Sequence, residues 1–159
     1  MFFRVGDFFV FIMFCVGLFY TDYSLAGQNP EVPESIVGVT VVNSEQMLEF
    51  MEYGKVLLID ARKPADFTFG TIPGSTHCQV VSGSPSFADD QVQLSVKDFR
   101  GCKRVREADR QQKVAVFCNG INCWRSGKGA YALKKMGFVN VLWYRIGMNN
   151  WKSQGLPLE

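Results

Sequence analysis

Two runs of consecutive apolar residues, at positions 56–59 and 114–117, constrain the fold of this chain more than any other feature. A strand with one solvent-facing side alternates apolar and polar residues, and these runs do not alternate. They are therefore predicted to be strands buried on both faces, as in a parallel sheet covered by helices. Helical patterns at 43–53 and 126–136 follow predicted strands. This order predicts an α/β fold with a central, mostly parallel sheet of about five strands flanked by helices.

Local signals mark the ends of other elements. Asn43 or Ser44 can cap the first helix, which Gly54 ends, and Pro64 opens a short helical turn. Further strands are expected at 37–42, 76–80 and 139–143. Residues 82–112 show no clear pattern beyond a loop at 82–86 and a mixed-charge stretch, which is either a solvated helix face or an anion-attracting rim.

The N-terminal segment differs from the rest of the chain. An apolar run at 8–20 follows Arg4 and precedes Ser24 and Ala26, small residues at the −3 and −1 positions of a possible cleavage site. This layout predicts a secretory signal peptide and an exported protein of the bacterial periplasm, or an inner-membrane protein if the segment is an uncleaved anchor. The expected organisation is a signal peptide or anchor at 1–26, a linker at 27–36 and one domain at 37–157.

Charge and cysteine content narrow the function classes. The net charge of +2 on 159 residues gives no reason to expect a nucleic-acid partner, and a membrane contact is expected only through an uncleaved anchor. Cleavage would leave Cys78, Cys102, Cys118 and Cys123. An even number of cysteines in an oxidising compartment permits disulfides, so pairs are possible between Cys78 and Cys102 and between Cys118 and Cys123.

One cysteine stands where reactivity is expected. Cys118 follows the buried run at 114–117 and precedes a helix, whose N-terminal N–H groups stabilise a thiolate. Arg125 adds a permanent positive charge. Asp60 ends the other buried run, and ligands of parallel sheets bind outside the carboxyl ends of the strands. The two strand ends therefore predict a thiolate site at one edge of the sheet.

Four segments in order carry a family resemblance. Residues 58–62 end a strand in Asp-x-Arg; residues 66–75 match (Glu/Asp)-(Phe/Tyr)-x-x-Gly-His-Ile-x-Gly-Ala, with Thr71 at the His position; the cysteine loop is third; and residues 147–157 match Gly-x-x-x-Trp-x-x-x-Gly-x-Pro. Together they resemble a single-domain rhodanese, which implies a rhodanese-like three-layer fold. The usual loop, Cys-x-x-Gly-x-Arg-Ser, separates Cys and Arg by four residues. Here six separate them, and the Cys-x4-Cys-Trp-Arg-Ser sequence is similar to exported rhodanese-like proteins named for a Cys…Cys-Trp (CXXCW) motif.

The resemblance implies sulfurtransferase activity. Cys118 would take sulfane sulfur from thiosulfate or a related small anionic donor, hold it as a covalent persulfide with no other cofactor or metal, and pass it to a thiol or protein acceptor. Arg125 would pair with the donor or lock the loop, Gly120 would supply a positive φ, and Ser126 would cap the helix. The expected anion-binding loop comprises Asn119, Gly120, Ile121, Asn122, Cys123, Trp124, Arg125 and Ser126.

Several neighbouring residues have two interpretations each. Arg62 either ties loops together through an acidic residue such as Asp66 or steers anions, and with Asp60 it would support the site. Trp124 either shields the persulfide or packs. Structural roles are expected for His77 and Trp151.

Alternatives to sulfur transfer remain open at this point. Cys123 could resolve an oxidised Cys118 into a disulfide, which would make the protein a thiol redox protein. A metal site of Cys118, Cys123, Cys78 and His77, a phosphatase-like loop and a non-catalytic binding domain are further alternatives.

Overall fold

The structure is a computed structural model that describes residues 29–159. It contains a five-stranded sheet in the order β1-β5-β4-β2-β3, in which every neighbouring pair is parallel. This arrangement confirms the predicted α/β fold. The expected signal segment at 1–26 lies outside the described residues.

The central strands of the sheet are longer than the edge strands. Central strands β2 (Val56–Asp60), β4 (Lys113–Phe117) and β5 (Val141–Tyr144) are almost wholly buried. Edge strands β1 (Thr40–Val41) and β3 (Thr76–His77) are shorter than the 37–42 and 76–80 predicted. Because an edge strand pairs on one side only, a β-rich sequence there forms fewer ladder bonds than the same sequence in the centre.

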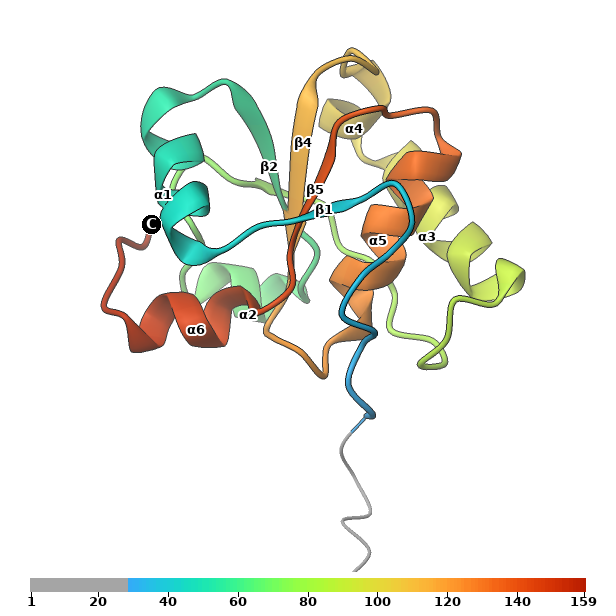
Figure 1. The fold of residues 1–159 in the computed structure, drawn as a ribbon, viewed down its shortest axis with the longest axis horizontal. Coiled ribbons are helices and arrows are strands. Elements are labelled where there is room, and N and C mark those ends of the chain that lie inside the picture. Colours follow the sequence, from blue (N-terminus) through green and yellow to red (C-terminus); the bar gives the residue numbers. More distant parts are fainter. Residues whose placement is uncertain (1–28) are drawn as a thin grey trace, which may run out of the picture.

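Helices cover both faces of the sheet (Figure 1). One layer holds α1 (Ser44–Tyr53), α2 (Pro64–Thr68) and α6 (Gly147–Ser153). The other holds α3 (Asp89–Gly101), α4 (Lys103–Glu107) and α5 (Trp124–Lys135). Alternate residues of one strand serve the two layers: Leu57 and Ile59 pack with α3 and α5, whereas Leu58 packs with α1 and α6.

The first helix begins and ends as predicted. Asn43 Oδ1 accepts the N–H of Gln46 at 2.9 Å, and Gln46 Oε1 accepts the N–H of Asn43 at 3.0 Å, so a capping box starts α1. Gly54 ends it.

The segment at 82–112 folds into α3 and α4 and contributes to the core. Val92, Val96 and Phe99 are buried against α5, so α3 is not merely a solvated helix face. A Cβ at Gly129 of α5 would lie 3.0 Å from Phe99 Cζ, which shows how closely the two helices approach. Cys102 at the end of α3 forms a disulfide with Cys78, with Cα atoms 5.7 Å apart.

No helix within residues 29–159 is long and apolar enough to cross a membrane. That part of the chain also brings no three His, Cys, Asp or Glu side chains together as metal ligands.

Candidate active site

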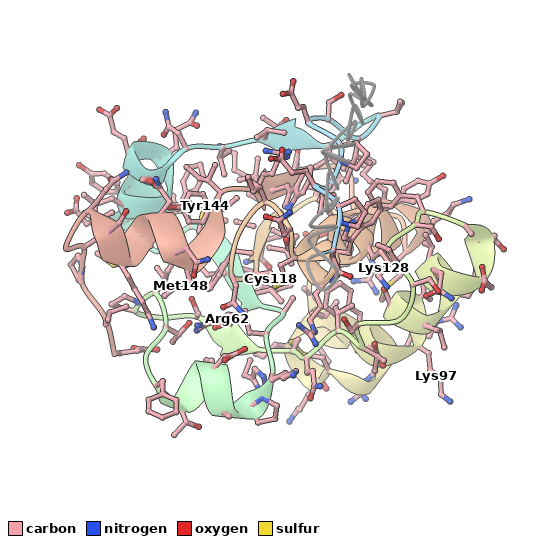
Figure 2. All side chains as sticks on the ribbon, turned by 90° about the horizontal axis from the view of Figure 1, so that it is seen from below. Arg62, Lys97, Cys118, Lys128, Tyr144 and Met148 are labelled. Atoms are coloured by element: carbon pink, nitrogen blue, oxygen red, sulfur yellow. A yellow bond between two sulfur atoms is a disulfide. The ribbon has the colours of Figure 1, made fainter. Side chains whose placement is uncertain are left out.

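The site lies where β2 and β4 end. Asp60 pairs in register with Phe117, so Cys118 follows one residue beyond the end of the buried sheet. Cys118 and Arg62 lie near the middle of the molecule when it is seen from this edge (Figure 2). The convergence expected from the two strand ends is present.

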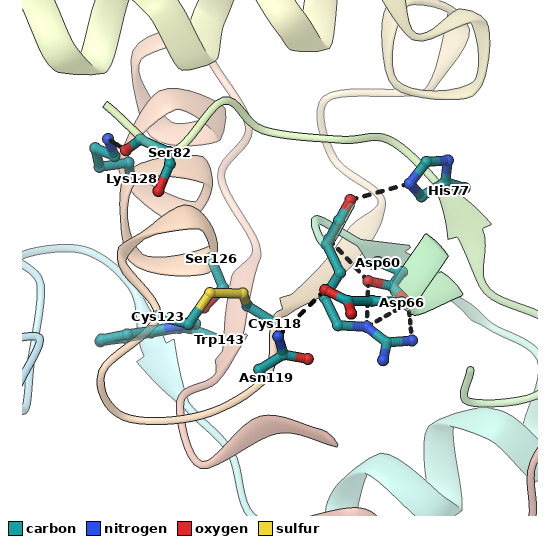
Figure 3. Close-up of a disulfide and its surroundings, with 11 residues drawn as sticks. Asp60, Asp66, His77, Ser82, Cys118, Asn119, Cys123, Ser126, Lys128 and Trp143 are labelled. Atoms are coloured by element: carbon teal, nitrogen blue, oxygen red, sulfur yellow. Dashed lines mark hydrogen bonds and ion pairs between the residues drawn. A yellow bond between two sulfur atoms is a disulfide. The ribbon is translucent and has the colours of Figure 1, made fainter. Parts of the chain in front are cut away.

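Cys118 and Cys123 form a disulfide across the loop (Figure 3). Their Cα atoms are 6.2 Å apart, and the N–H of Cys123 donates to the Gly120 carbonyl at 2.9 Å. Cys118 is 0% exposed, whereas Cys123 is partly exposed. The structure therefore shows the site in its oxidised form, with a buried cysteine at the strand end and a partly exposed cysteine directly before α5.

The N-terminus of α6 holds the first half of the loop. The N–H groups of Met148 and Asn149 donate to the carbonyls of Cys118 and Asn119, both at 2.8 Å. A Cβ at Gly147 would overlap the Cys118 carbonyl oxygen and lie 2.9 Å from Gly120 N. Only glycine therefore allows α6 to approach the loop this closely.

An N-terminal strap, residues 29–33, holds the second half of the loop. This segment was expected to belong to a linker, and its backbone is extended, but it is docked on the domain. Three loop residues bond to it: the Asn122 amide donates to Asn29 O, the Trp124 indole to Pro30 O, and the Ile121 carbonyl accepts the Val32 N–H, each at 2.8 Å. Arg145 fixes the strap from the other side by donating to Val32 O at 2.7 Å.

A cavity of about 550 Å³ opens beside the loop. Residues 119–125 line it, together with side chains from the strap, α6 and the 82–84 loop. Among the described residues Arg125 is the only charged residue in this lining, and its buried Nε has no hydrogen-bond partner. Cys118 and Ser126 do not contribute to the described lining. The structure thus places seven predicted loop residues around one cavity.

Two details of the predicted loop are wrong. Helix α5 begins at Trp124, so Cys123 and not Ser126 precedes it; Ser126 Oγ is buried and accepts the Trp143 indole N–H at 3.0 Å. Gly120 has no positive φ. A Cβ there would make ordinary van der Waals contacts with Asn149 Nδ2 at 3.4 Å and Ile146 O at 3.5 Å, so space does not require glycine at this position either.

Arg62 is buried next to the site and has a structural role there. Its guanidinium pairs with Asp60 at 2.6 Å in the protein interior and donates to the Gly70 carbonyl at 2.8 Å. The loop-tying interpretation is therefore supported, but the partner is Asp60 and not Asp66, which instead accepts the Asn119 amide at 3.3 Å. Thr71, at the position of the family's His, donates to Asp60 at 2.8 Å.

The two expectations of structural roles agree with the geometry. His77 Nε2 lies 3.0 Å from the Arg62 carbonyl, and its ring stacks on Phe67. Trp151 is buried, with its indole N–H on Pro157 O at 2.7 Å. The suggested metal ligands are not brought together, because their cysteines form two separate disulfides. Trp124 both packs on Phe87 and lines the cavity.

A buried lysine near the cavity was not predicted. Lys128 of α5 donates through Nζ to the carbonyls of Ser82 and Ser84. Burial, and then the charge of Arg125, lowers the pKa of Lys128. Its position one helical turn after the buried Trp124 was the available signal, since residues four apart share a helix face.

Comparison with known proteins gives the family. A model of the rhodanese-like domain matches residues 43–154, which include the strand ends, the cysteine loop and most of the closing segment. The chain belongs to the rhodanese-like domain family. Comparison with curated protein sequences finds no significant match.

Solved structures show the same rhodanese-like fold. An uncharacterized protein from Saccharomyces cerevisiae is 23% identical, with a TM-score of 0.54 over 73% of this chain and 92% of that one. A full-length protein from Lactobacillus plantarum is 20% identical, with a TM-score of 0.56 over 75% and 86%. A polysulfide-sulfur transferase homodimer from Wolinella succinogenes is 20% identical, with a TM-score of 0.52 over 77% and 79%. At these identities the comparisons establish the fold.

Proposed function

We propose that this rhodanese-like protein is a sulfurtransferase that carries sulfane sulfur on Cys118 and works when the Cys118–Cys123 bond is reduced. The observation that carries the proposal is the position of Cys118, directly after β4 and in the loop that enters α5. The family match and the structural neighbour named as a polysulfide-sulfur transferase support the same chemistry.

The reaction has two balanced steps. The Cys118 thiolate attacks the outer sulfur of thiosulfate, a new S–S bond forms, and sulfite leaves with the electron pair of the broken bond. An acceptor thiolate then attacks the outer persulfide sulfur, and Cys118 leaves as the thiolate. Both forms of Cys118 are anionic, and the N-terminus of α5 together with Arg125 supplies positive potential near them.

A thiol redox function is the second candidate, and the Cys118–Cys123 disulfide favours it. Cys123 as thiolate would attack the inner sulfur of the Cys118 persulfide, which expels hydrosulfide and closes the disulfide. A thiol reductant would then return both cysteines to the reduced state.

The proposed setting is that of an exported protein. The N-terminal apolar run and the even number of cysteines outside it support the bacterial periplasm, with an inner-membrane anchor as the alternative. The Cys-x4-Cys-Trp loop supports kinship with the exported proteins of the CXXCW group. Thiosulfate or a related small anion is the proposed donor, and a thiol or protein is the acceptor.

Turnover in two cysteine variants separates the candidates. With thiosulfate, a thiol acceptor and prior reduction, we expect Cys118→Ser to abolish transfer and Cys123→Ser to retain it without a need for reductant. Loss of turnover in both variants would favour the redox function. Full transfer by Cys118→Ser would refute the proposed role of Cys118. Absence of transfer in reduced wild type would instead favour a non-catalytic binding module.

A further inference from the structure

We infer that a small anionic thiol reduces the oxidised site by entering the 550 Å³ cavity and attacking the sulfur of Cys123, not that of Cys118. The inference deepens the proposed function and rests on it, because reduction of this bond is what frees Cys118 for sulfur transfer.

Access distinguishes the two sulfurs. An attacking thiolate must reach one sulfur from the side opposite the breaking bond. Cys118 is 0% exposed and does not belong to the described cavity lining. Cys123 is partly exposed and lines the cavity. Figure 3 shows Cys118 beside the end of β4 and Cys123 on the far side of the bond, toward the loop. The open approach therefore leads to Cys123.

Leaving-group chemistry alone would predict the opposite. Cys123 immediately precedes α5, and a helix N-terminus stabilises a thiolate there, which makes Cys123 the better leaving group. Attack at Cys118 would, however, require the loop to detach from α6, which holds the carbonyls of Cys118 and Asn119. We expect access to outweigh the leaving-group effect.

The lining indicates the class of thiol. The cavity lies in the size range of small-molecule sites, roughly 300–1,000 Å³. Arg125 is the only charged side chain in its described lining, and the buried Nε of Arg125 lacks a partner. Asn122 and Asn149 add polar groups to the same lining. A thiol that carries a carboxylate would pair with the guanidinium of Arg125, the one charge in the described lining.

The reduction consumes two thiol molecules and moves two electrons. The first thiolate bonds to Cys123 Sγ, the Cys123–Cys118 bond breaks, and Cys118 leaves as a thiolate. A second thiolate then attacks the sulfur of the bound thiol. The two small thiols leave as a disulfide, and Cys123 leaves as a thiolate.

Mapping of the first intermediate tests the site of attack. Oxidised wild-type protein is mixed briefly with excess glutathione, quenched with acid, alkylated and mapped by peptide mass. The result expected is glutathione on Cys123 and the alkyl group on Cys118 in the mixed-disulfide population. Glutathione on Cys118, or equally on both, would overturn the inference.

The rate of reduction tests the charge recognition. We expect Arg125→Gln to lower the rate with glutathione relative to neutral 2-mercaptoethanol by about three- to fivefold, the range of a partly exposed ion pair. Arg106→Gln, on the exposed surface of α4, is the matched control and should leave the ratio unchanged. An equal effect of Arg125→Gln on both thiols would contradict recognition of an anionic thiol.

Failure of this inference is distinguishable from failure of the proposed function. If reduced wild-type protein gains sulfur from thiosulfate but glutathione maps to Cys118, the route of reduction is wrong and sulfur transfer stands. If glutathione maps to Cys123 and no sulfur is gained, the route is right and the sulfurtransferase proposal falls.

Discussion

At the scale of single residues, the buried ion pair between Asp60 and Arg62 fixes the floor of the site. We expect Arg62→Met to lower the free energy of unfolding by about 3–5 kcal/mol, because it leaves a buried carboxylate without its cation. Urea unfolding at neutral pH measures the loss. Arg106→Met is the control: the Arg106–Glu107 pair is more than half exposed on both sides, so its loss should be less than about 0.5 kcal/mol. A cost below about 1 kcal/mol for Arg62→Met would contradict the assigned role.

Tyr144 should make stability depend on pH in the alkaline range. Burial raises the pKa of Tyr144, against the opposing effect of its hydrogen bond to Ser44. The folded protein therefore holds the phenol proton more tightly, and this contribution is present below the unfolded pKa of about 10 and lost as pH rises through the folded pKa. In urea unfolding, the advantage of wild type over Tyr144→Phe should shrink above about pH 10.

The exposed Tyr53 provides a control for the loss of a tyrosine hydroxyl. Tyr53→Phe should leave the free energy of unfolding at neutral pH close to that of wild type. A difference between wild type and Tyr144→Phe that is constant with pH would show that the Tyr144 pKa is not raised.

The positions of the candidate site residues could be predicted from the sequence, but their hydrogen-bond partners could not. Cys118, Arg125 and Asp60 could be placed at strand and helix ends because those positions follow from local pattern. The pairing of Asp66 with Asn119, and of the Trp143 indole with Ser126, depends on how the chain folds back on itself. Such choices are tertiary and have no local signal.

At the scale of elements, the contact between α6 and the cysteine loop leaves no room for an added side chain. Gly147→Ala adds a Cβ into the backbone of residues 118–120 at a φ of 59°. Gly155→Ala meets a similar φ of 65°, but no heavy atom of another described element lies within 4 Å. Gly155→Ala should cost only the left-handed backbone penalty of about 1–2 kcal/mol.

We expect Gly147→Ala to cost about 1–3 kcal/mol more than its control, through the added clash, and to reduce sulfur transfer sharply because the loop must shift. Thermal unfolding and thiosulfate turnover measure the two effects. Equal losses in the two variants would mean that close approach of α6 does not position the loop.

The continuous apolar strands and the helices α1 and α5 were predictable, whereas α3 was not. The central strands β2 and β4 matched the expected runs closely. Helix α3 was missed although Val92, Val96 and Phe99 follow a helical spacing, because a polar loop at 82–86 precedes it and a mixed-charge stretch overlaps its end. The docking of the 29–33 strap was also missed, since proline-rich extended sequence is typical of linkers as well.

At the scale of the whole molecule, the Cys78–Cys102 disulfide fastens the α3 segment to the sheet. Its partners are 24 residues apart in sequence, and closure of such a loop lowers the entropy of the unfolded chain, worth about 3.5 kcal/mol in the chain-entropy model. Without reductant, we expect the double variant Cys78→Ala/Cys102→Ala to have a free energy of unfolding in urea lower than wild type by about this amount. With reductant, the free energies of unfolding of the two proteins should differ little. Equal stability of oxidised wild type and double variant would refute this role.

The two disulfides lie in different surroundings. The Cys78–Cys102 pair lies among core residues, whereas Cys123 faces a cavity at the carboxyl edge of the sheet. Both pairs could be proposed from the sequence, but only the fold shows that Cys118 is buried and Cys123 partly exposed. Reduction should therefore begin at the Cys118–Cys123 bond.

The central claim is that Cys118 carries the sulfur, and intact mass tests it most directly. The protein is reduced, freed of reductant and mixed with thiosulfate, and its intact mass is measured before and after the mixing. The variants Cys118→Ser and Cys123→Ser are measured in the same way. We predict a gain of one sulfur atom in wild type, unless Cys123 has closed the disulfide, and in Cys123→Ser, with no gain in Cys118→Ser. A sulfur gain that persists in Cys118→Ser, or no gain in Cys123→Ser, would contradict the account.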